Sequence, residues 1–271
     1  MTSHTDESAD PVHSPSADAG PQTPPTDELD AGGGRGPNRR ARAVAVAAGL
    51  TVAALVLGNL VALVVLVPLL LLGGGISPLL LVGISVFGVQ VVGFVGVSLV
   101  YARRTGRRAV VVRRPTGRDA LWVGGGVVAA LLVAAAAGVV MTELGLEPTS
   151  GISDLGELDA RVFLVLIPLS VLVIAPTEEL LFRGVIQGRL RESFGPVAAV
   201  VGASLFFGSI HFLNFGGPLA ARLAPTLAIT LVSLLFGYGY ERTGNLLVPV
   251  VMHGGYNAAL LAVTYLSVVG V

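Results

Sequence analysis

Residues 43–71 read AVAVAAGLTVAALVLGNLVALVVLVPLLL, and none of these side chains is charged. A helix of about 20 apolar residues crosses the hydrocarbon core of a bilayer, so this run is long enough for one span. The run lacks the alternation of apolar and polar residues that marks a membrane β-barrel. The 271-residue chain is 53% hydrophobic and only 13% charged, whereas a soluble domain carries about 25% charged residues. The sequence therefore predicts a membrane protein built from helices.

Six more apolar runs follow the first one, and breaks rich in glycine, proline or arginine separate several of them. The predicted class is an all-α, polytopic bundle of about seven transmembrane helices. A break at Pro68 inside the first run would raise that number to eight. The chain has no cysteine, which excludes disulfides and thiol catalysis. The predicted spans are 43–71, 78–101, 120–142, 162–190, 196–215, 224–240 and 247–270.

The chain divides into four parts by composition. Residues 1–42 are dominated by Pro, Asp, Ser, Thr and Gly up to a short arginine cluster, and they are predicted to form a disordered cytoplasmic tail. Three accessory transmembrane helices are expected over 43–142, followed by an extracytoplasmic loop over 143–160. The remaining helices, over 161–271, form a predicted core that carries nearly all the intramembrane ionisable residues.

Arginine in the loops predicts the orientation of the helices. The 102–119 loop carries seven arginines, and the 143–160 loop carries five acidic residues and no arginine. Cytoplasmic loops are enriched in basic residues, so the first loop is predicted to lie inside the cell and the second outside. Alternation then puts the N-terminus in the cytoplasm and the C-terminus outside. The expected location is the cell membrane, with several passes.

Five ionisable side chains lie inside the apolar runs: Glu178, Glu179, Arg183, His211 and His253. A charge at bilayer depth costs at least about 2.5 kcal/mol, so such residues usually face an interior cavity and have a function there. Carboxylates, imidazoles and a guanidinium are typical of acid–base or metal-binding sites.

The spacing of the acidic pair indicates different roles for its two members. Glu179 and Arg183 are four residues apart, which predicts an ion pair along one helix face. Glu178 then has no partner on its own helix, and a lone buried carboxylate is a candidate general base.

The other polar residues are predicted to approach Glu178 from neighbouring helices. Glu178 lies 16 residues before Phe194, near the turn between two predicted spans, and His211 lies 17 residues after it. At 1.5 Å per residue both reach the same depth if the helices are unbroken. His253 and Asn257 share a helix face at i and i+4.

Two chemistries suit this set of side chains. In one, Glu178 is the base, His211 positions a water molecule, and His253 with Asn257 stabilises the oxyanion. In the other, zinc is bound by ligands drawn from Glu178, Glu179, His211 and His253 and holds a reactive water. The short zinc-protease motif H-E-x-x-H and the serine motif G-x-S-x-G are both absent.

Three short motifs carry a family resemblance. Glu178–Arg183 fits E-E-x-x-x-R, Phe207–His211 fits F-x-x-x-H, and His253–Asn257 fits H-x-x-x-N. Over residues 160–262 the chain resembles the CPBP (Abi, or CAAX-protease and bacteriocin-processing) family of intramembrane proteases.

The resemblance implies an endopeptidase that cleaves a membrane-associated or prenylated (CaaX-type) protein within the bilayer. It also implies that 161–271 is the catalytic core, with Glu178 and His211 as the couple that activates water. His253 and Asn257 are then transition-state stabilisers, and Glu179, Arg183 and Phe207 support the site. The family is described both as metalloproteases and as metal-free glutamate proteases, so zinc stays open as a cofactor.

Two other functional classes fit the composition. A non-catalytic membrane scaffold or bacteriocin-immunity-type protein would use the same buried residues for folding and binding. A proton-coupled transporter would use them as a proton relay, although the first three spans offer few polar residues for a path. The expected partners are a membrane-associated protein or peptide and the lipid bilayer, with no nucleic acid.

Overall fold

The structure is a computed structural model that describes residues 37–106 and 111–270. Nearly all of the predicted N-terminal tail lies outside the described residues. Every described element belongs to one compact unit, Gly36–Val271. In chain order the elements are α1 (Pro37–Leu71), α2 (Pro78–Val86), η1 (Phe87–Val95), α3 (Gly96–Thr105), α4 (Gly117–Glu143), β1 (Thr149–Ser150), α5 (Gly151–Leu158), α6 (Arg161–Leu169), η2 (Ser170–Ile174), α7 (Ala175–Glu179), η3 (Leu180–Gln187), α8 (Gly188–Phe194), α9 (Pro196–His211), η4 (Phe212–Asn214), β2 (Phe215–Gly216), α10 (Leu219–Thr243) and α11 (Leu247–Val269).

Seven helices in the described part of the chain are long and apolar enough to cross a membrane, as the sequence predicts. α1 continues through Pro68, so the first run forms one span and not two. α1 also begins at Pro37, so residues 37–42 are helical and the predicted tail boundary at residue 42 is wrong. The seven spans are 38–71, 78–105, 117–143, 161–194, 196–214, 219–243 and 247–269.

Local signals explain where several helices begin and end. Ser77 caps α2 by accepting a hydrogen bond from the N–H of Leu80, and Pro78 occupies the first turn, where its missing N–H does no harm. Thr116 and Asp119 form a reciprocal capping box at the start of α4. Gly244 ends α10 with φ +61°, a left-handed conformation that favours glycine.

The predicted extracytoplasmic loop, 143–160, contains ordered structure. β1 and the short helix α5 lie within it. β1 pairs antiparallel with β2, with Thr149 opposite Gly216 and Ser150 opposite Phe215. This small ladder joins the loop after α4 to the loop that follows α9, which is the helix that ends at His211.

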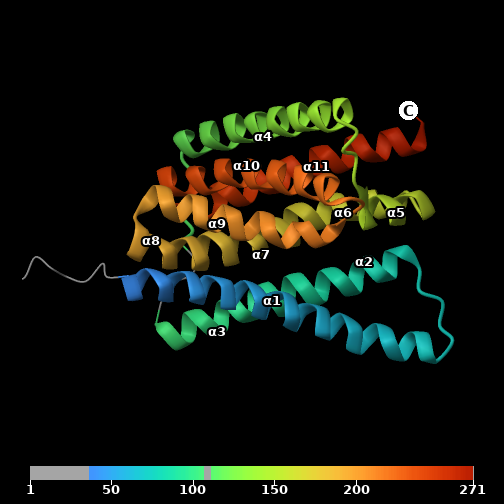
Figure 1. Cartoon of the computed structure of the whole chain (residues 1–271), viewed down its shortest axis with the longest axis horizontal. Helices are drawn as coiled ribbons and strands as arrows, with labels where there is room; N and C mark the ends of the chain where they lie inside the picture. The colour runs from blue at the N-terminus through green and yellow to red at the C-terminus, as the bar shows by residue number, and fades with distance from the viewer. Residues whose placement is uncertain (1–36, 107–110, 271) are drawn as a thin grey trace, which may run out of the picture. The chain divides into compact units, whose positions relative to one another are not determined.

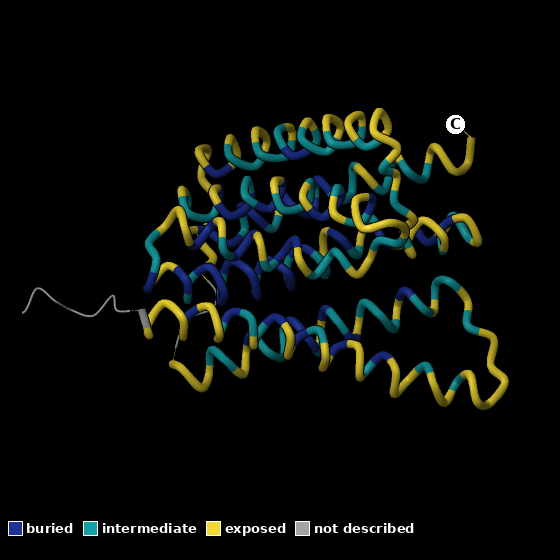
Figure 2. Tube along the Cα trace, viewed as in Figure 1, coloured by how far each residue is buried: buried dark blue, intermediate teal, exposed yellow. Residues whose placement is uncertain are grey.

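The span 161–194 lies at the centre of the helix packing. In its most apolar stretch 44% of the residues are buried, whereas in the corresponding stretch of the span 117–143 only 11% are buried. α11 packs against α6, η2 and α7, and α9 packs against η3 and α8 (Figure 1). Figure 2 shows the buried residues gathered on these inner segments and the exposed ones on the outer faces of α1 and α4.

Two of the spans contain π-helical segments, which widen the helix at the level of the polar residues. η2 lies between Pro168 and Pro176, and a proline interrupts the normal ladder because it has no N–H to donate. η3 follows at Leu180–Gln187 and carries Arg183. η1, in the span 78–105, carries Gln90. Such segments occur often at functional sites.

Candidate active site

The predicted ion pair between Glu179 and Arg183 is present. Arg183 Nε donates to Glu179 Oε2 at 2.9 Å, and neither side chain is exposed. Arg183 also donates to the hydroxyl and the backbone carbonyl of Ser233, at 2.6 and 3.1 Å, and to the Ser204 hydroxyl at 3.4 Å. Buried charges are stable only when they are paired and hydrogen-bonded, and these contacts meet that requirement.

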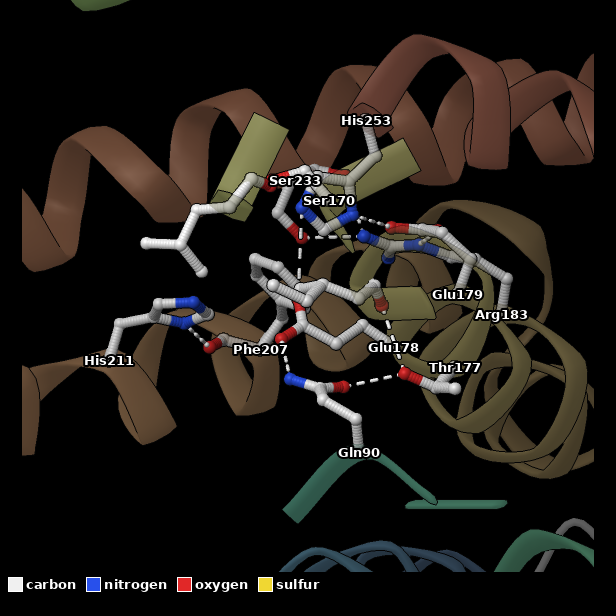
Figure 3. A network of polar contacts seen from close by, with 12 residues as sticks. Gln90, Ser170, Thr177, Glu178, Glu179, Arg183, Phe207, His211, Ser233 and His253 are labelled. Carbon is white, nitrogen blue, oxygen red and sulfur yellow. Dashed lines mark hydrogen bonds and ion pairs between the residues drawn. The ribbon is translucent and has the colours of Figure 1, made fainter. Parts of the chain in front are cut away.

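His253 extends this network from α11. Its Nδ1 lies 3.0 Å from Glu179 Oε1. An ionised carboxylate can only accept, so Nδ1 carries the hydrogen and Glu179 fixes the orientation of the ring. Phe236 stacks on the ring, with centroids 5.1 Å apart and planes 21° apart. The fixed ring directs Nε2 toward Glu178, whose Oε2 is 3.7 Å away (Figure 3).

Glu178 has a partner that comes from outside the predicted core. Gln90 of η1 donates its amide Nε2 to Glu178 Oε1 at 2.9 Å. The Thr177 hydroxyl donates to Gln90 Oε1 at 2.5 Å and also lies 3.0 Å from the Ile174 carbonyl. One carboxylate oxygen of Glu178 is therefore held by an amide, while the other faces an imidazole nitrogen.

His211 lies beside Phe207 and apart from the glutamates (Figure 3). Its Nδ1 bonds to the Phe207 backbone carbonyl at 2.8 Å, and the two rings lie 4.7 Å apart. Within residues 37–106 and 111–270, no hydrogen bond or ion pair joins His211 to Glu178. The equal depth predicted for Glu178 and His211 requires unbroken α-helix, but η3 lies between Glu178 and Phe194 and changes both the rise and the rotation per residue.

Phe207 is buried and lies between the two histidines. Its ring is 4.7 Å from that of His211 and 5.5 Å from that of His253. It also packs edge-on against Phe182, at 5.1 Å, and lies 5.8 Å from the Arg183 guanidinium carbon. Phe207 therefore packs against both histidines and lies beside the Arg183 guanidinium.

Asn257 follows His253 by one turn of α11 and is half-buried. No hydrogen bond joins its amide to another residue in the described part of the chain.

The four zinc candidates do not gather into a metal site in this arrangement. Among the described residues, no group of three or more His, Cys, Asp or Glu side chains is placed to hold a metal ion. Glu179 is engaged by Arg183 and His253, which leaves only Glu178 facing the Nε2 of His253. A catalytic zinc needs three protein ligands with an open position.

A cavity of about 350 Å³ lies at the surface of α4, α10 and α11. Its lining includes Trp122, Gly126, Tyr238 and Met252, and it contains none of the predicted site residues. The buried polar network is therefore distinct from this cavity.

Sequence reasoning did not identify Gln90, Thr177, Ser233 or Phe236. Gln90 gives the clearest signal, because it is an amide in the middle of an apolar span with glycines two residues before and three after it. Ser233 and Phe236 carry no comparable signal, because serines and phenylalanines are common in transmembrane helices.

Comparison with known proteins agrees with the geometry. Residues 160–259 match the family model described as type II CAAX prenyl endopeptidase Rce1-like. The uncharacterized protein YpbD of Bacillus subtilis (strain 168) is 37% identical over 82 residues, which make up 30% of this chain and 36% of that protein. The match thus spans about a third of the relative's length, and no solved structure matches the chain. The matched segment contains all three motifs, so over residues 160–259 this multi-pass membrane protein is similar to the type II CAAX prenyl endopeptidases that the family model describes.

Proposed function

We propose that this chain hydrolyses a peptide bond of a membrane-associated protein with a water molecule that Glu178 activates. One observation carries the proposal. Glu178 is a buried carboxylate with one oxygen fixed by Gln90 and the other 3.7 Å from the Nε2 of His253. A general base must be held in place and must keep one oxygen available for a proton, and this arrangement supplies both.

His253 lies between the carboxylates of Glu178 and Glu179. Glu178 and Glu179 contribute two negative charges, and Arg183 contributes one positive charge. His253 directs Nδ1–H to Glu179 and Nε2 toward Glu178, and the proposed reaction uses it with a hydrogen on Nε2. His253 then has a donor available for an oxyanion.

The proposed reaction proceeds through these groups. Glu178 Oε2 accepts a proton from water as the water oxygen adds to the carbonyl carbon of the substrate. The oxyanion accepts hydrogen bonds from His253 Nε2–H and from the Asn257 amide. Glu178 then passes its proton to the leaving nitrogen as the carbon–nitrogen bond breaks. The products are a carboxylic acid and an amine, and transfer of the acid's proton to the amine gives a carboxylate and an ammonium.

His211 is proposed to orient the water. Its Nδ1 must donate to the Phe207 carbonyl, since a carbonyl can only accept. In the neutral ring, Nε2 then carries a lone pair that accepts the second hydrogen of the water. Its half-buried position suits a group that meets water as well as substrate.

The proposed substrate is a protein held at the membrane, with a prenylated CaaX-type C-terminus as the first one to examine. The family description names prenyl endopeptidases, which supports this choice. The purified protein can be offered a farnesylated CaaX peptide and the same peptide without the lipid. Comparing their cleavage shows whether the protein requires the lipid or only the peptide sequence.

The test compares wild type with Glu178→Gln, an isosteric change that removes the base, in lipid nanodiscs with these peptides. Glu157→Gln is the matched control, because Glu157 is an exposed carboxylate in α5. We expect cleavage by wild type and the control and none by Glu178→Gln. If Glu178→Gln keeps the cellular function at equal abundance, the scaffold interpretation replaces the enzyme.

A further inference from the structure

Gln90 lies in the span 78–105, which is outside residues 160–259 that match the family. It is nevertheless a direct neighbour of the proposed base, with Nε2 2.9 Å from Glu178 Oε1. The side chain is 8% exposed, so water does not replace the contact easily. A helix outside the segment that matches the family thus contributes a buried polar group to the site.

The direction of the Gln90 amide follows from its two partners. An ionised carboxylate accepts only, so the NH₂ group must face Glu178. The amide oxygen then faces Thr177, whose hydroxyl donates to it at 2.5 Å. Thr177 precedes Glu178 in the chain, so the glutamine bridges two consecutive residues of α7. Such a bridge fixes both the backbone position and the carboxylate of Glu178.

Close packing of glycines holds the helix that presents Gln90. A Cβ added to Gly88 would meet Gly58 O at 2.6 Å, and one added to Gly93 would meet Ala54 O at 2.4 Å. These contacts join η1 to the backbone of α1. Two residues that are five apart lie on nearly the same face of a π-helix, which they do not in an α-helix. Gly88 and Gly93 therefore both face α1. Gln90, about half a turn from Gly88, faces the opposite side.

We propose that Gln90 is a positioning residue, which with Thr177 holds the Glu178 carboxylate in the orientation that the reaction uses. The inference rests on the proposed function. It means that the α1 and α2–η1–α3 segments complete the site and do not merely flank it. The residue acts through Glu178 and does not touch the substrate.

The test measures kcat and KM of the full-length protein in nanodiscs with a farnesylated CaaX peptide, per amount of monodisperse protein. Gln90→Met keeps the length of the side chain and removes both hydrogen bonds. We expect kcat to fall about ten- to hundredfold, the effect of losing one hydrogen bond to a charged group, with KM unchanged within about twofold. Ser98→Ala is the control, since Ser98 is buried in the same span and its hydroxyl bonds to no described residue.

Thr177→Val provides a second, independent variant. It should lower kcat less than Gln90→Met does, because the glutamine keeps its contact with Glu178. The double variant should be no worse than Gln90→Met alone, since both changes disrupt one bridge. If the fall in kcat of the double variant is the product of the falls of the two single variants, the two residues act separately and the bridge is wrong.

The outcomes separate this inference from the proposed function. If Glu178→Gln abolishes cleavage while Gln90→Met and Thr177→Val keep kcat within about twofold of wild type, the positioning role is wrong and the protease stands. A fall in kcat that only follows a loss of folded protein also overturns it. If Glu178→Gln cleaves as wild type does, the proposed function fails, and the role of Gln90 fails with it.

Discussion

His253 Nε2 lies 3.7 Å from Glu178 Oε2, while the Nδ1 of the same ring lies 3.0 Å from Glu179 Oε1. One imidazole thus connects the two adjacent carboxylates of the first motif. Glu179 is tied to Arg183 and orients the ring, and Glu178 faces the nitrogen that the orientation leaves available. The consecutive glutamates therefore have different partners, and the prediction for Arg183 follows from the separate roles proposed for them.

Loss of Arg183 should harm folding more than loss of the proposed base does. Arg183→Ala leaves the fully buried Glu179 without its guanidinium, and breaking a buried ion pair costs about 3–5 kcal/mol. Glu178→Gln keeps the shape of the side chain and leaves the pair between Glu179 and Arg183 intact. The amount of each variant in membranes and its midpoint of thermal unfolding in detergent test this. Equal abundance and equal midpoints would contradict the assigned roles.

The contact between α1 and η1 should tolerate no added methyl group. Gly88→Ala and Gly93→Ala each force a Cβ into backbone atoms of α1 at 2.6 and 2.4 Å. Overpacking of this kind costs about 1–3 kcal/mol and should lower the unfolding midpoint. Gly96→Ala is the matched control, because a Cβ there meets nothing within 4 Å. The close packing of η1 on α1 is wrong if all three variants have the same unfolding midpoint.

A chelator should not remove activity. The described residues place Glu178 opposite His253 but no third ligand beside them. We expect cleavage of a membrane-anchored peptide to persist after prolonged treatment with a strong zinc chelator and dialysis. Activity that disappears on chelation and returns with zinc would show that a metal site forms, and would reject the metal-free reaction.

The orientation predicted from loop arginines can be tested by labelling. Because the chain has no cysteine, single cysteines can be introduced without background. Arg114 is exposed in the arginine-rich loop, and Asp154 is exposed in the acidic loop. Each can be replaced by cysteine, as Arg114→Cys and Asp154→Cys. A membrane-impermeant maleimide on intact cells should label position 154 and leave 114 unmodified until the cells are opened. The reverse pattern would invert the topology.

The sequence predicted most of the fold because each span is a long apolar run, and a run of that length folds in a bilayer mainly as one membrane-spanning helix. It also predicted the pair Glu179–Arg183, since i,i+4 neighbours meet within a single helix. The contact between Gln90 and Glu178 could not be predicted in this way. It depends on packing between distant helices and on π-helical segments that change which residues share a face.

His211 shows the same limit. The sequence predicts the same depth for His211 and Glu178 only if both helices are unbroken, but η3 lies between Glu178 and the turn at Phe194. The structure gives His211 a bond to the Phe207 carbonyl and no direct contact with the glutamate in the described part of the chain. Its proposed role in orienting water therefore rests on the free Nε2 and its position beside Phe207.

The central claim is that Glu178 performs proteolysis in the membrane. The most direct measurement compares the protein termini in membrane fractions of cells that carry wild type or Glu178→Gln. The account predicts new C-terminal or juxtamembrane ends that are present with wild type and vanish with the variant at equal abundance. An unchanged set of termini, with both proteins accumulated equally, would contradict it.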